Sequence, residues 1–342
     1  MVDSKQNWKA WIYLLPALIL LAVFTVYPII NTVRISFLEG YQPLGDIGGE
    51  KYAFGVSNFS KVIMYKDFLT CLKNTVLLCV LTVPLSCFLA LLVAVCLNSI
   101  NRLGKVLQTI YFLPYVTNSI AIGMVFAMMF NIVGLSQVNA DTYNGSLTVY
   151  NIYTNSAGVR MGYTAQSWGI INNIIQFFGG NPVNWINSGT SITNPGGSTY
   201  AANIAVMVIY IVWNALPFKI LILLGGLQGV SKQYYEAAKI DGTSRWRVFW
   251  RITVPLLSPM IAYVVITGFI GGFKEYSSIV GVFGEDMGPA GDGSLMTIVG
   301  YVYKAISSNS YGTASAASLI LFGIILVVTA INLYVSNKKV HY

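Results

Sequence analysis

Charged residues are scarce in this sequence, and their scarcity argues against most kinds of water-soluble protein. Only 9% of the 342 residues are Asp, Glu, Lys or Arg, whereas 55% are hydrophobic. An ordinary soluble domain carries roughly 25% charged residues. The apolar residues gather in long runs, the first of which covers residues 11–30. Because a helix needs about 20 mostly apolar residues to cross a bilayer, the sequence predicts an all-α membrane protein.

Residues that build metal and catalytic sites are also few. The one histidine, His341, stands in the tail, and no C-x-x-C pair occurs. The four cysteines lie in or beside one apolar run, and we interpret them as small packing residues: Cys71, Cys79, Cys87 and Cys96. A membrane enzyme would need a nucleophile with a base, or a metal cluster. Glu39 and Glu275 alone do not provide this, so we expect no catalytic residue and no metal.

Two phosphate-binding patterns are missing as well. The net charge of +8 is not gathered into a Lys/Arg-rich run, so nucleic acid is not an expected partner. The loop pattern G-x-x-x-x-G-K-[ST] is absent. We therefore expect no cofactor on this chain, and any ATP that drives it must be bound by another subunit.

Six apolar segments are predicted to span the membrane. They cover about residues 11–35, 73–97, 107–131, 201–226, 256–280 and 314–335. Proline and glycine within them are compatible with helices, because neighbouring helices can satisfy the freed backbone groups. The first segment resembles a signal peptide, but it is too long and lacks a cleavage site, so we expect an uncleaved span.

Basic residues predict the orientation. Eleven Lys and Arg lie in the short segments 1–10, 98–106, 229–255 and 336–342, and seven are spread over the much longer opposite connections. Basic residues concentrate on the cytoplasmic side. We therefore expect the chain in the inner membrane of the cell. Both terminal tails, 1–10 and 336–342, are expected on the cytoplasmic side.

The longest external connection is polar but nearly uncharged. Residues 132–200 contain only Asp141 and Arg160 as charged residues and are rich in Asn, Ser, Thr, Gly and Tyr. Apolar residues at helical spacing within 170–178 predict a short amphipathic helix. In the external segment 36–72, a similar pattern over 58–69 predicts a helix lying along the outer leaflet. The scattered aromatic residues favour an ordered extracellular lobe.

The segment 229–255 is predicted to form two short helices around a break. Residues 236–239 are good helix formers, and Asp241 and Gly242 interrupt them. Gly242 suits the positive φ that ends a helix, and Thr243 or Ser244 suits the cap of the next. One face of the second helix carries Trp246, Phe249, Trp250 and Thr253, and another carries Arg247 and Arg251. The pattern alone fits either a helix on lipid headgroups or a docking element for a cytoplasmic partner.

The order of residues resembles the EAA loop of ABC importer permeases. That pattern is EAA, three residues, Gly, nine residues, Ile, one residue and Leu-Pro. Here Glu236-Ala237-Ala238 is followed by Gly242, Ile252 and Val254-Pro255, and Val254 in place of Leu stays apolar. The segments LLPALILLAVFTVYPIINTVRISF, SNFSKV, YFLPYVTNSIAIGMVFAMMF and WNALPFKILILLGGLQ look like the maltose and oligosaccharide branch of that family. Only about 132–168 falls outside the resemblance, as an extra insertion.

The resemblance implies a type I importer permease, with a core at 73–335 that includes the insertion 132–200 and the EAA loop 229–255. Such a chain pairs with a second permease, two ATPase subunits that bind ATP and Mg, and an external sugar-binding protein. It is not itself an enzyme. The implied ATPase-coupling residues are Glu236, Ala237, Ala238, Asp241 and Gly242.

A substrate path is predicted on the fourth and fifth spans, because polar residues inside a span default to functional candidates. An aromatic face can stack on a sugar ring while amide and carboxylate groups bind its hydroxyls. The candidates are Trp213, Asn214, Ala215, Phe218, Thr267, Gly268, Gly271, Gly272, Lys274 and Glu275. The alternative is that Trp213 only packs against a helix and that Lys274 and Glu275 reach the outer interface.

Two other functions stay open at this stage. The solute could be a glycerol-linked compound instead of a di- or oligosaccharide. An ion-driven secondary transporter would typically show inverted repeats and interrupted helices in matching halves, and the sequence predicts neither.

Overall fold

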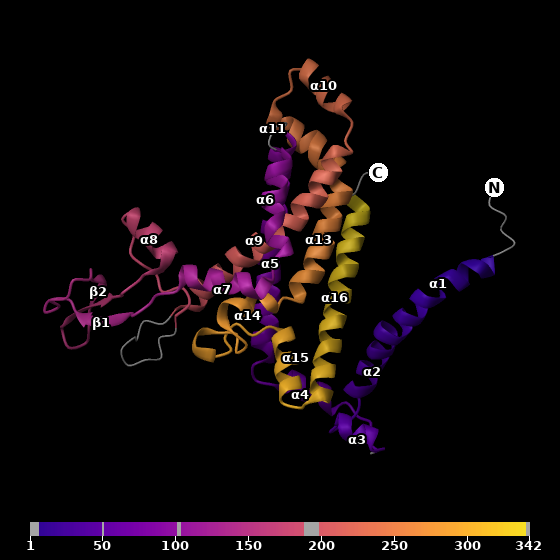
Figure 1. The fold of residues 1–342 in the computed structure, drawn as a ribbon, viewed down its shortest axis with the longest axis horizontal. Coiled ribbons are helices and arrows are strands. Elements are labelled where there is room, and N and C mark those ends of the chain that lie inside the picture. Colours follow the sequence, from indigo (N-terminus) through magenta and orange to yellow (C-terminus); the bar gives the residue numbers. More distant parts are fainter. Residues whose placement is uncertain (1–6, 50, 101–103, 188–197, 340–342) are drawn as a thin grey trace. The chain divides into compact units, whose positions relative to one another are not determined.

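The computed structural model describes residues 7–49, 51–100, 104–187 and 198–339 (Figure 1). The chain divides into two compact units, Met1–Leu69 with Tyr301–Ile324, and Thr70–Gly300 with Ile325–Tyr342. Each is described by itself. Most of the predicted N-terminal tail, the last residues of the C-terminal tail and part of the insertion lie outside the described residues.

The first unit begins with a long apolar helical run. Helix α1 (Asn7–Leu21) continues through a π-helical turn (Ala22–Val26) into α2 (Tyr27–Ser36). None of the most apolar part of this run is buried. Such a surface is stable only in contact with hydrocarbon or with another chain. The predicted first span is thus a continuous helix with an uncovered apolar surface.

Short helices complete this unit: α3 (Pro43–Ile47) and α4 (Ser57–Met64), with parts of α15 (Ile298–Ser307) and α16 (Tyr311–Lys339). The helix predicted within 58–69 is confirmed as α4. Buried Asn58 fixes the chain that follows α2, because its Nδ2 donates to the carbonyls of Ser36 and Leu38 at 3.0 and 2.9 Å.

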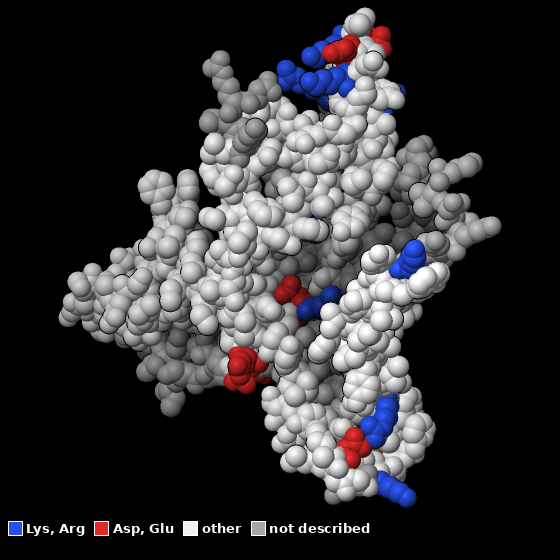
Figure 2. Space-filling view, turned by 45° about the vertical axis from the view of Figure 1, so that its right-hand side comes forward, with Lys and Arg blue, Asp and Glu red and all other residues white. Residues whose placement is uncertain are grey.

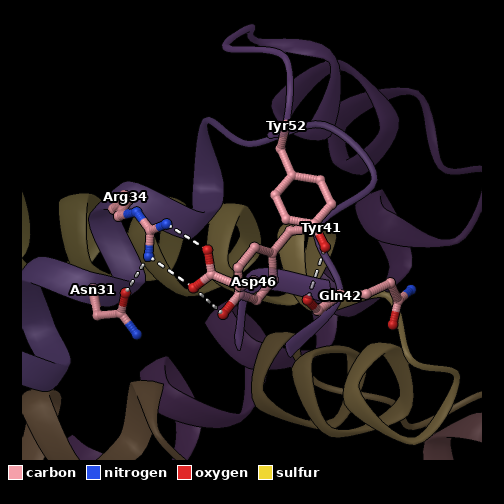
Figure 3. A network of polar contacts seen from close by, with 6 residues as sticks. All are labelled: Asn31, Arg34, Tyr41, Gln42, Asp46 and Tyr52. Carbon is pink, nitrogen blue, oxygen red and sulfur yellow. Dashed lines mark hydrogen bonds and ion pairs between the residues drawn. The ribbon is translucent and has the colours of Figure 1, made fainter. Parts of the chain in front are cut away.

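A polar network joins α2 to α3 (Figure 3). The guanidinium of Arg34 contacts both carboxylate oxygens of Asp46, at 2.7 and 3.1 Å, and the hydroxyl of Tyr41 donates to the same carboxylate at 3.3 Å. Hydrogen bonding from Arg34 holds the pKa of Asp46 below its usual range. The paired charges fix the direction in which the chain leaves α2.

The second unit is a helical bundle built on α5 (Phe68–Asn98) and α9 (Tyr200–Gln228). About half of the most apolar stretch of each is buried, 44% and 50%. Their inward side chains form the core together with residues of α13 (Ser258–Phe273) and α14 (Ser277–Phe283): Leu78, Met207, Tyr210, Leu223, Val264 and Ile279. The remaining surface of these helices is apolar and uncovered, as expected for lipid-facing helices.

Two of the six predicted spans are broken, which corrects the expectation of uninterrupted helices. The third consists of α6 (Gly104–Val116) and α7 (Ser119–Phe130), bent by 98°. The fifth, predicted over 256–280, ends as a helix at Phe273 and is followed by the separate helix α14; at its start, α13 is bent by 70° against residues 245–256. In the described residues four helices are long and apolar enough to cross a membrane, or six spans exist if each bent pair counts as one.

A pair of glycines brings α7 and α14 into close contact. A Cβ added to Gly123 would lie 2.7 Å from the Cα of Gly281, and one added to Gly281 would lie 2.9 Å from the carbonyl oxygen of Ile120. Real Cβ atoms do not approach backbone this closely. The missing side chains therefore let the two helices cross with their backbones in contact, as small residues do in membrane bundles.

The insertion contains a small antiparallel sheet that the sequence did not predict. Strands β1 (Ser136–Asn139), β2 (Tyr150–Thr154) and β3 (Arg160–Thr164) pair in the order β1-β3-β2. Strand β2 is irregular between Tyr150 and Tyr153, where Asn151 has a positive φ of 54°. Asp141 and Arg160, the two charges of this segment, form an ion pair at 3.1 Å.

The amphipathic helix predicted within 170–178 is confirmed as α8 (Gly169–Phe177). Asn172, fully buried, holds it to the following chain: its side chain donates to the carbonyls of Trp168 and Val183 and accepts from the amide of Val183 and the indole of Trp185. All its hydrogen-bonding groups are satisfied. The part of the insertion that the structure describes is thus an ordered lobe.

Candidate functional site

A cavity of about 350 Å³ lies in the second unit, beside the break between α6 and α7. The broken helix contributes one wall, and α9 and α13 contribute the others. Its lining residues are Tyr115, Thr117, Ser119, Asn214, Ala215, Phe218, Lys219, Thr267 and Gly268. Three helices that are distant in sequence therefore supply hydroxyl, amide, ammonium and aromatic groups to one space.

The local sequence explains why the helix breaks here. Asn118 has an extended conformation, and its Oδ1 accepts from the amides of Ile120 and Ala121 at 2.9 and 3.2 Å. This is the N-cap arrangement that starts a new helix. Thr117 donates its hydroxyl to the carbonyl of Pro114 at 2.8 Å. The cap of α7 and the end of α6 thus satisfy their own polar groups. This lowers the free-energy cost of breaking a helix inside an apolar span.

Polar contacts hold α9 against the start of α7. The hydroxyls of Tyr210 and Ser119 lie 3.1 Å apart, and Nδ2 of Asn214 donates to the Ser119 hydroxyl at 3.4 Å. The long bond leaves the Asn214 amide able to exchange this partner for a ligand hydroxyl. On the other wall, the Thr267 hydroxyl donates to the carbonyl of Tyr263 at 2.7 Å, so its oxygen keeps the capacity to accept.

An aromatic pair forms another part of the lining. The rings of Tyr115 and Phe218 stack with centroids 5.8 Å apart and an interplanar angle of 19°. A flat aromatic surface next to hydroxyl and amide groups is the usual composition of a small-ligand pocket. Apolar ring faces of a sugar can pack on such a surface while its hydroxyls reach the polar side.

The structure brings five of the ten predicted path residues together in this cavity: Asn214, Ala215, Phe218, Thr267 and Gly268. The other five lie outside its lining. Trp213 packs on Phe126, with ring centroids 5.2 Å apart. Gly272 lies against Cys79, whose sulfur would be 2.8 Å from an added Cβ, whereas Gly271 faces open space.

The last two predicted residues follow α13. Lys274 is exposed at the C-terminal cap of the helix. Glu275 is half-buried, and its Oε1 accepts from the amide of Ser278 at 3.2 Å, so it caps the start of α14. These contacts give the two residues a structural explanation that does not involve the cavity.

Sequence reasoning missed Lys219. This residue, the one charge in α9, is only 5% exposed and donates from Nζ to the hydroxyl of Ser86 on α5. A Cβ added to Gly268 would lie 3.3 Å from Nζ, so the glycine leaves room for the ammonium group. The signal was present, because an ionisable residue inside an apolar span is a functional candidate by default.

The loop between α9 and α13 forms a second candidate site. Helix α10 (Lys232–Ile240) begins at Ser231, whose hydroxyl accepts from the amide of Gln233. Gly242, just after the end of α10, has a φ of +64°. The amide of Gly242 donates to the carbonyl of Lys239, and the amide of Thr243 donates to the carbonyl of Ala238. These two bonds make a Schellman motif. The predicted helix break at Gly242 is therefore confirmed.

The next helix has the predicted cap. Ser244 accepts from the amide of Arg247 and precedes α11 (Arg245–Val248), which a π-helical turn (Phe249–Thr253) connects to α12 (Val254–Leu256). The rings of Trp246, Phe249 and Trp250 contact one another, which confirms their shared face. Hydroxyls of Tyr235 and Thr253, 3.4 Å apart, join α10 to this second helix.

The loop exposes an unusual amount of apolar surface among its charges. Ile240 is 87% exposed and Trp246 is 69% exposed. Figure 2 shows Lys and Arg gathered around a few acidic groups at the end of the second unit that carries α10 and α11. Of the predicted coupling residues, Glu236, Ala237, Asp241 and Gly242 are exposed, and Ala238 is buried and anchors the helix.

The chain is similar to known transport proteins over most of its length. Residues 83–341 match a family described as the inner membrane component of binding-protein-dependent transport systems. An arabinooligosaccharide transport system permease of Halalkalibacterium halodurans is 28% identical, over 98% of this chain and 89% of that protein. A trehalose/maltose transport system permease of Thermococcus litoralis is 27% identical, over 99% of this chain and 98% of its own length.

Solved structures show the same fold. One chain of a bacterial alginate ABC transporter, crystallised with an alginate pentasaccharide-bound periplasmic protein, superposes with a TM-score of 0.72 at 20% identity. The superposition covers 99% of this chain and 98% of that chain.

Proposed function

Since the chain belongs to the family of binding-protein-dependent transport system inner membrane components, we propose that it is the sugar-translocating permease subunit of an ATP-driven importer. Its solute is a di- or oligosaccharide. The two relatives described above are permeases for arabinooligosaccharides and for trehalose or maltose. A third relative, a lactose transport system permease of Rhizobium radiobacter, is 25% identical over 97% of this chain.

The observation that carries the proposal is the cavity at the break between α6 and α7. Its volume of about 350 Å³ is in the range of ligand pockets. The Tyr115 and Phe218 rings offer a surface for a sugar ring, and Asn214 and Thr267 offer groups for its hydroxyls. Binding at a broken helix lets the solute meet polar groups at a depth where an intact apolar helix has none.

The loop around α10 is the element proposed to couple this cavity to ATP. Its exposed Glu236, its rigid turn at Gly242 and its exposed aromatic cluster suit docking on a folded partner. ATP and Mg bind to two partner ATPase subunits in this proposal. A second permease completes the membrane part, and an external binding protein delivers the sugar.

Uptake into proteoliposomes tests the proposal. The chain is co-expressed with a candidate second permease, ATPase and binding protein from the same genome, and the purified complex is reconstituted with ATP inside. We expect uptake of at least one of maltose, lactose, trehalose or an arabinooligosaccharide that requires both ATP and the binding protein. Uptake driven by a sodium or proton gradient without ATP would overturn the importer, and uptake of glycerol 3-phosphate alone would overturn the sugar.

A further inference from the structure

We propose that the cavity selects saccharides that carry a carboxylate, and that Lys219 is the residue that binds this group. The inference deepens the proposed function and rests on it. Lys219 lines the cavity together with Asn214 and Thr267. None of the nine lining residues is acidic. The negative charge that pairs with the ammonium group of Lys219 is therefore supplied by the solute.

The hydrogen bonding of Lys219 leaves donors for a ligand. An ammonium group has three protons to donate. One goes to the hydroxyl of Ser86, and the thiol of Cys87 adjoins the group. Both partners are neutral, and the two ion pairs found in the described residues, Arg34 with Asp46 and Arg160 with Asp141, do not involve Lys219. A carboxylate oxygen beside Nζ would supply the opposite charge that a buried cation needs.

The position of Lys219 excludes the common explanation for a lysine in an apolar helix. Such lysines usually extend to the membrane surface. Lys219 lies nine residues before the end of α9 at Gln228, which is about 14 Å along the helix, and nineteen residues after Tyr200. Its ammonium group instead turns inward, to Ser86 of α5. The chain therefore keeps a cation at this depth in the bundle.

The chemistry of the site favours a carboxylate over a phosphate. A phosphate monoester carries about −1.5 to −2 charges at pH 7, and one ammonium group cannot neutralise it. Uncompensated charge at this depth is costly. A uronate unit carries a single negative charge, and its ring and hydroxyls suit the Tyr115 and Phe218 rings and the Asn214 amide.

Equilibrium binding to the assembled complex in nanodiscs, without the binding protein, tests this inference. The radiolabelled probes are digalacturonate, neutral trehalose and trehalose 6-phosphate. The wild-type complex is expected to bind digalacturonate at least about tenfold more tightly than trehalose, the factor that one charge-assisted hydrogen bond supplies. Lys219→Met and Lys219→Gln should bind digalacturonate and trehalose equally, and Lys219→Arg should keep part of the preference for digalacturonate.

Lys304→Met is the matched control, because Lys304 is an exposed lysine in α15, outside the cavity lining. This variant should keep the full preference. Equal affinities in the wild type, or an unchanged preference in both neutral Lys219 variants, would overturn the inference. Tightest binding of trehalose 6-phosphate would overturn the carboxylate. In each of these cases ATP-dependent uptake of a saccharide would leave the proposed function standing, and its absence would overturn that function separately.

Discussion

At the scale of single residues, Asn214 holds the position most easily tested in the cavity. Its amide reaches the Ser119 hydroxyl over 3.4 Å, a weak bond that a sugar hydroxyl can replace. Asn214→Ala is expected to raise the KM for sugar uptake roughly fivefold to tenfold, the loss of about 1 kcal/mol from one hydrogen bond.

Uptake kinetics in proteoliposomes measure this effect, with ATPase stimulation by the binding protein recorded alongside. Asn98→Ala, at the exposed end of α5, is the control and should keep the wild-type KM. Wild-type kinetics for Asn214→Ala with every sugar that the complex transports would show that this residue only packs.

Asp46 gives the first unit a stability that depends on pH. Because its hydrogen bond to Arg34 lowers its pKa in the folded state, the carboxylate stabilises the fold above the ordinary Asp pKa of about 3.9. This contribution is lost as the pH falls through the lower pKa of the folded state. The melting temperature of the wild type should therefore exceed that of Asp46→Asn at pH 7, and the difference should shrink below about pH 4.

The measurement is thermal unfolding in detergent over pH 3 to 7. Asp141→Asn provides a comparison, since Asp141 forms the other ion pair, in the sheet of the insertion. If the melting temperature of the wild type exceeds that of Asp46→Asn by the same amount down to pH 3, the pH dependence does not come from the interaction of Asp46 with Arg34.

Residue patterns predicted part of the cavity because they reflect local chemistry. Asn214 and Thr267 are polar residues within apolar runs, and both line it. Tyr115 and Ser119 could not be predicted in this role, because they reach the cavity only through the break at Asn118. The apolar run on both sides of Asn118 concealed the helix cap that its side chain makes.

At the scale of elements, the turn after α10 is specified strongly enough to be predicted from sequence. Gly242 ends the helix with positive φ, and an added side chain would meet no neighbour but would strain the backbone. Gly242→Val should therefore cost roughly 1–3 kcal/mol in the turn and reduce ATP-dependent uptake. Glu236→Lys should reduce uptake and loosen the ATPase subunits without preventing membrane insertion.

Co-purification of the ATPase and uptake rates measure both effects. Gly229→Ala is the control in the same loop, because Gly229 has an ordinary φ of −78°. Full uptake and normal recovery of the complex in both Gly242→Val and Glu236→Lys would remove the loop from the coupling mechanism.

The crossing of α7 and α14 is a second element-scale test. Gly281→Val would place side-chain atoms inside the backbone of α7, where even a Cβ comes within 3.0 Å of the Cα of Gly123. Overpacking of this kind costs about 1–3 kcal/mol. We expect a lower melting temperature of the purified chain, measured by thermal unfolding.

The matched control is Gly225→Ala in α9, where an added Cβ meets nothing within 4 Å. Its melting temperature should be equal to or above that of the wild type. An unchanged melting temperature for Gly281→Val would mean that the two helices separate easily.

At the scale of the whole molecule, the orientation of the chain is the main prediction still to be tested. Because basic residues concentrate on the cytoplasmic side of a membrane, we expect the α10 loop in the cytoplasm and the insertion outside. In Figure 1 the sheet and α10 occupy separate parts of the second unit. Cysteines placed at Ser156 and Lys239, both exposed, should differ in intact cells, with labelling from outside at residue 156 only.

A Cys96→Ser background removes the one exposed thiol among the four cysteines. Labelling of both sites after the membrane is opened is the control. Strong labelling at residue 239 in intact cells would reverse the orientation.

The fold class was predictable because apolar length is a property of the whole chain. The sheet of the insertion was not, since its strands are short and polar, as in Ser136–Asn139, and no family resemblance covers them. The bends at Asn118 and Leu257 also depend on tertiary packing. Because these breaks are present, the expected lack of interrupted helices no longer argues against a secondary transporter, and family membership decides the class.

The irregularity in β2 has a consequence for crowded membranes. Strand β2 forms an outer edge of the sheet, where open backbone groups can recruit a strand from another copy. The extra residue between Tyr150 and Tyr153 interrupts the row of such groups, and the side chain of Asn151 is tied to the carbonyl of Pro182 at 2.9 Å. Neighbouring copies therefore find no regular template on this edge, which disfavours strand pairing through β2 when many permeases share one bilayer.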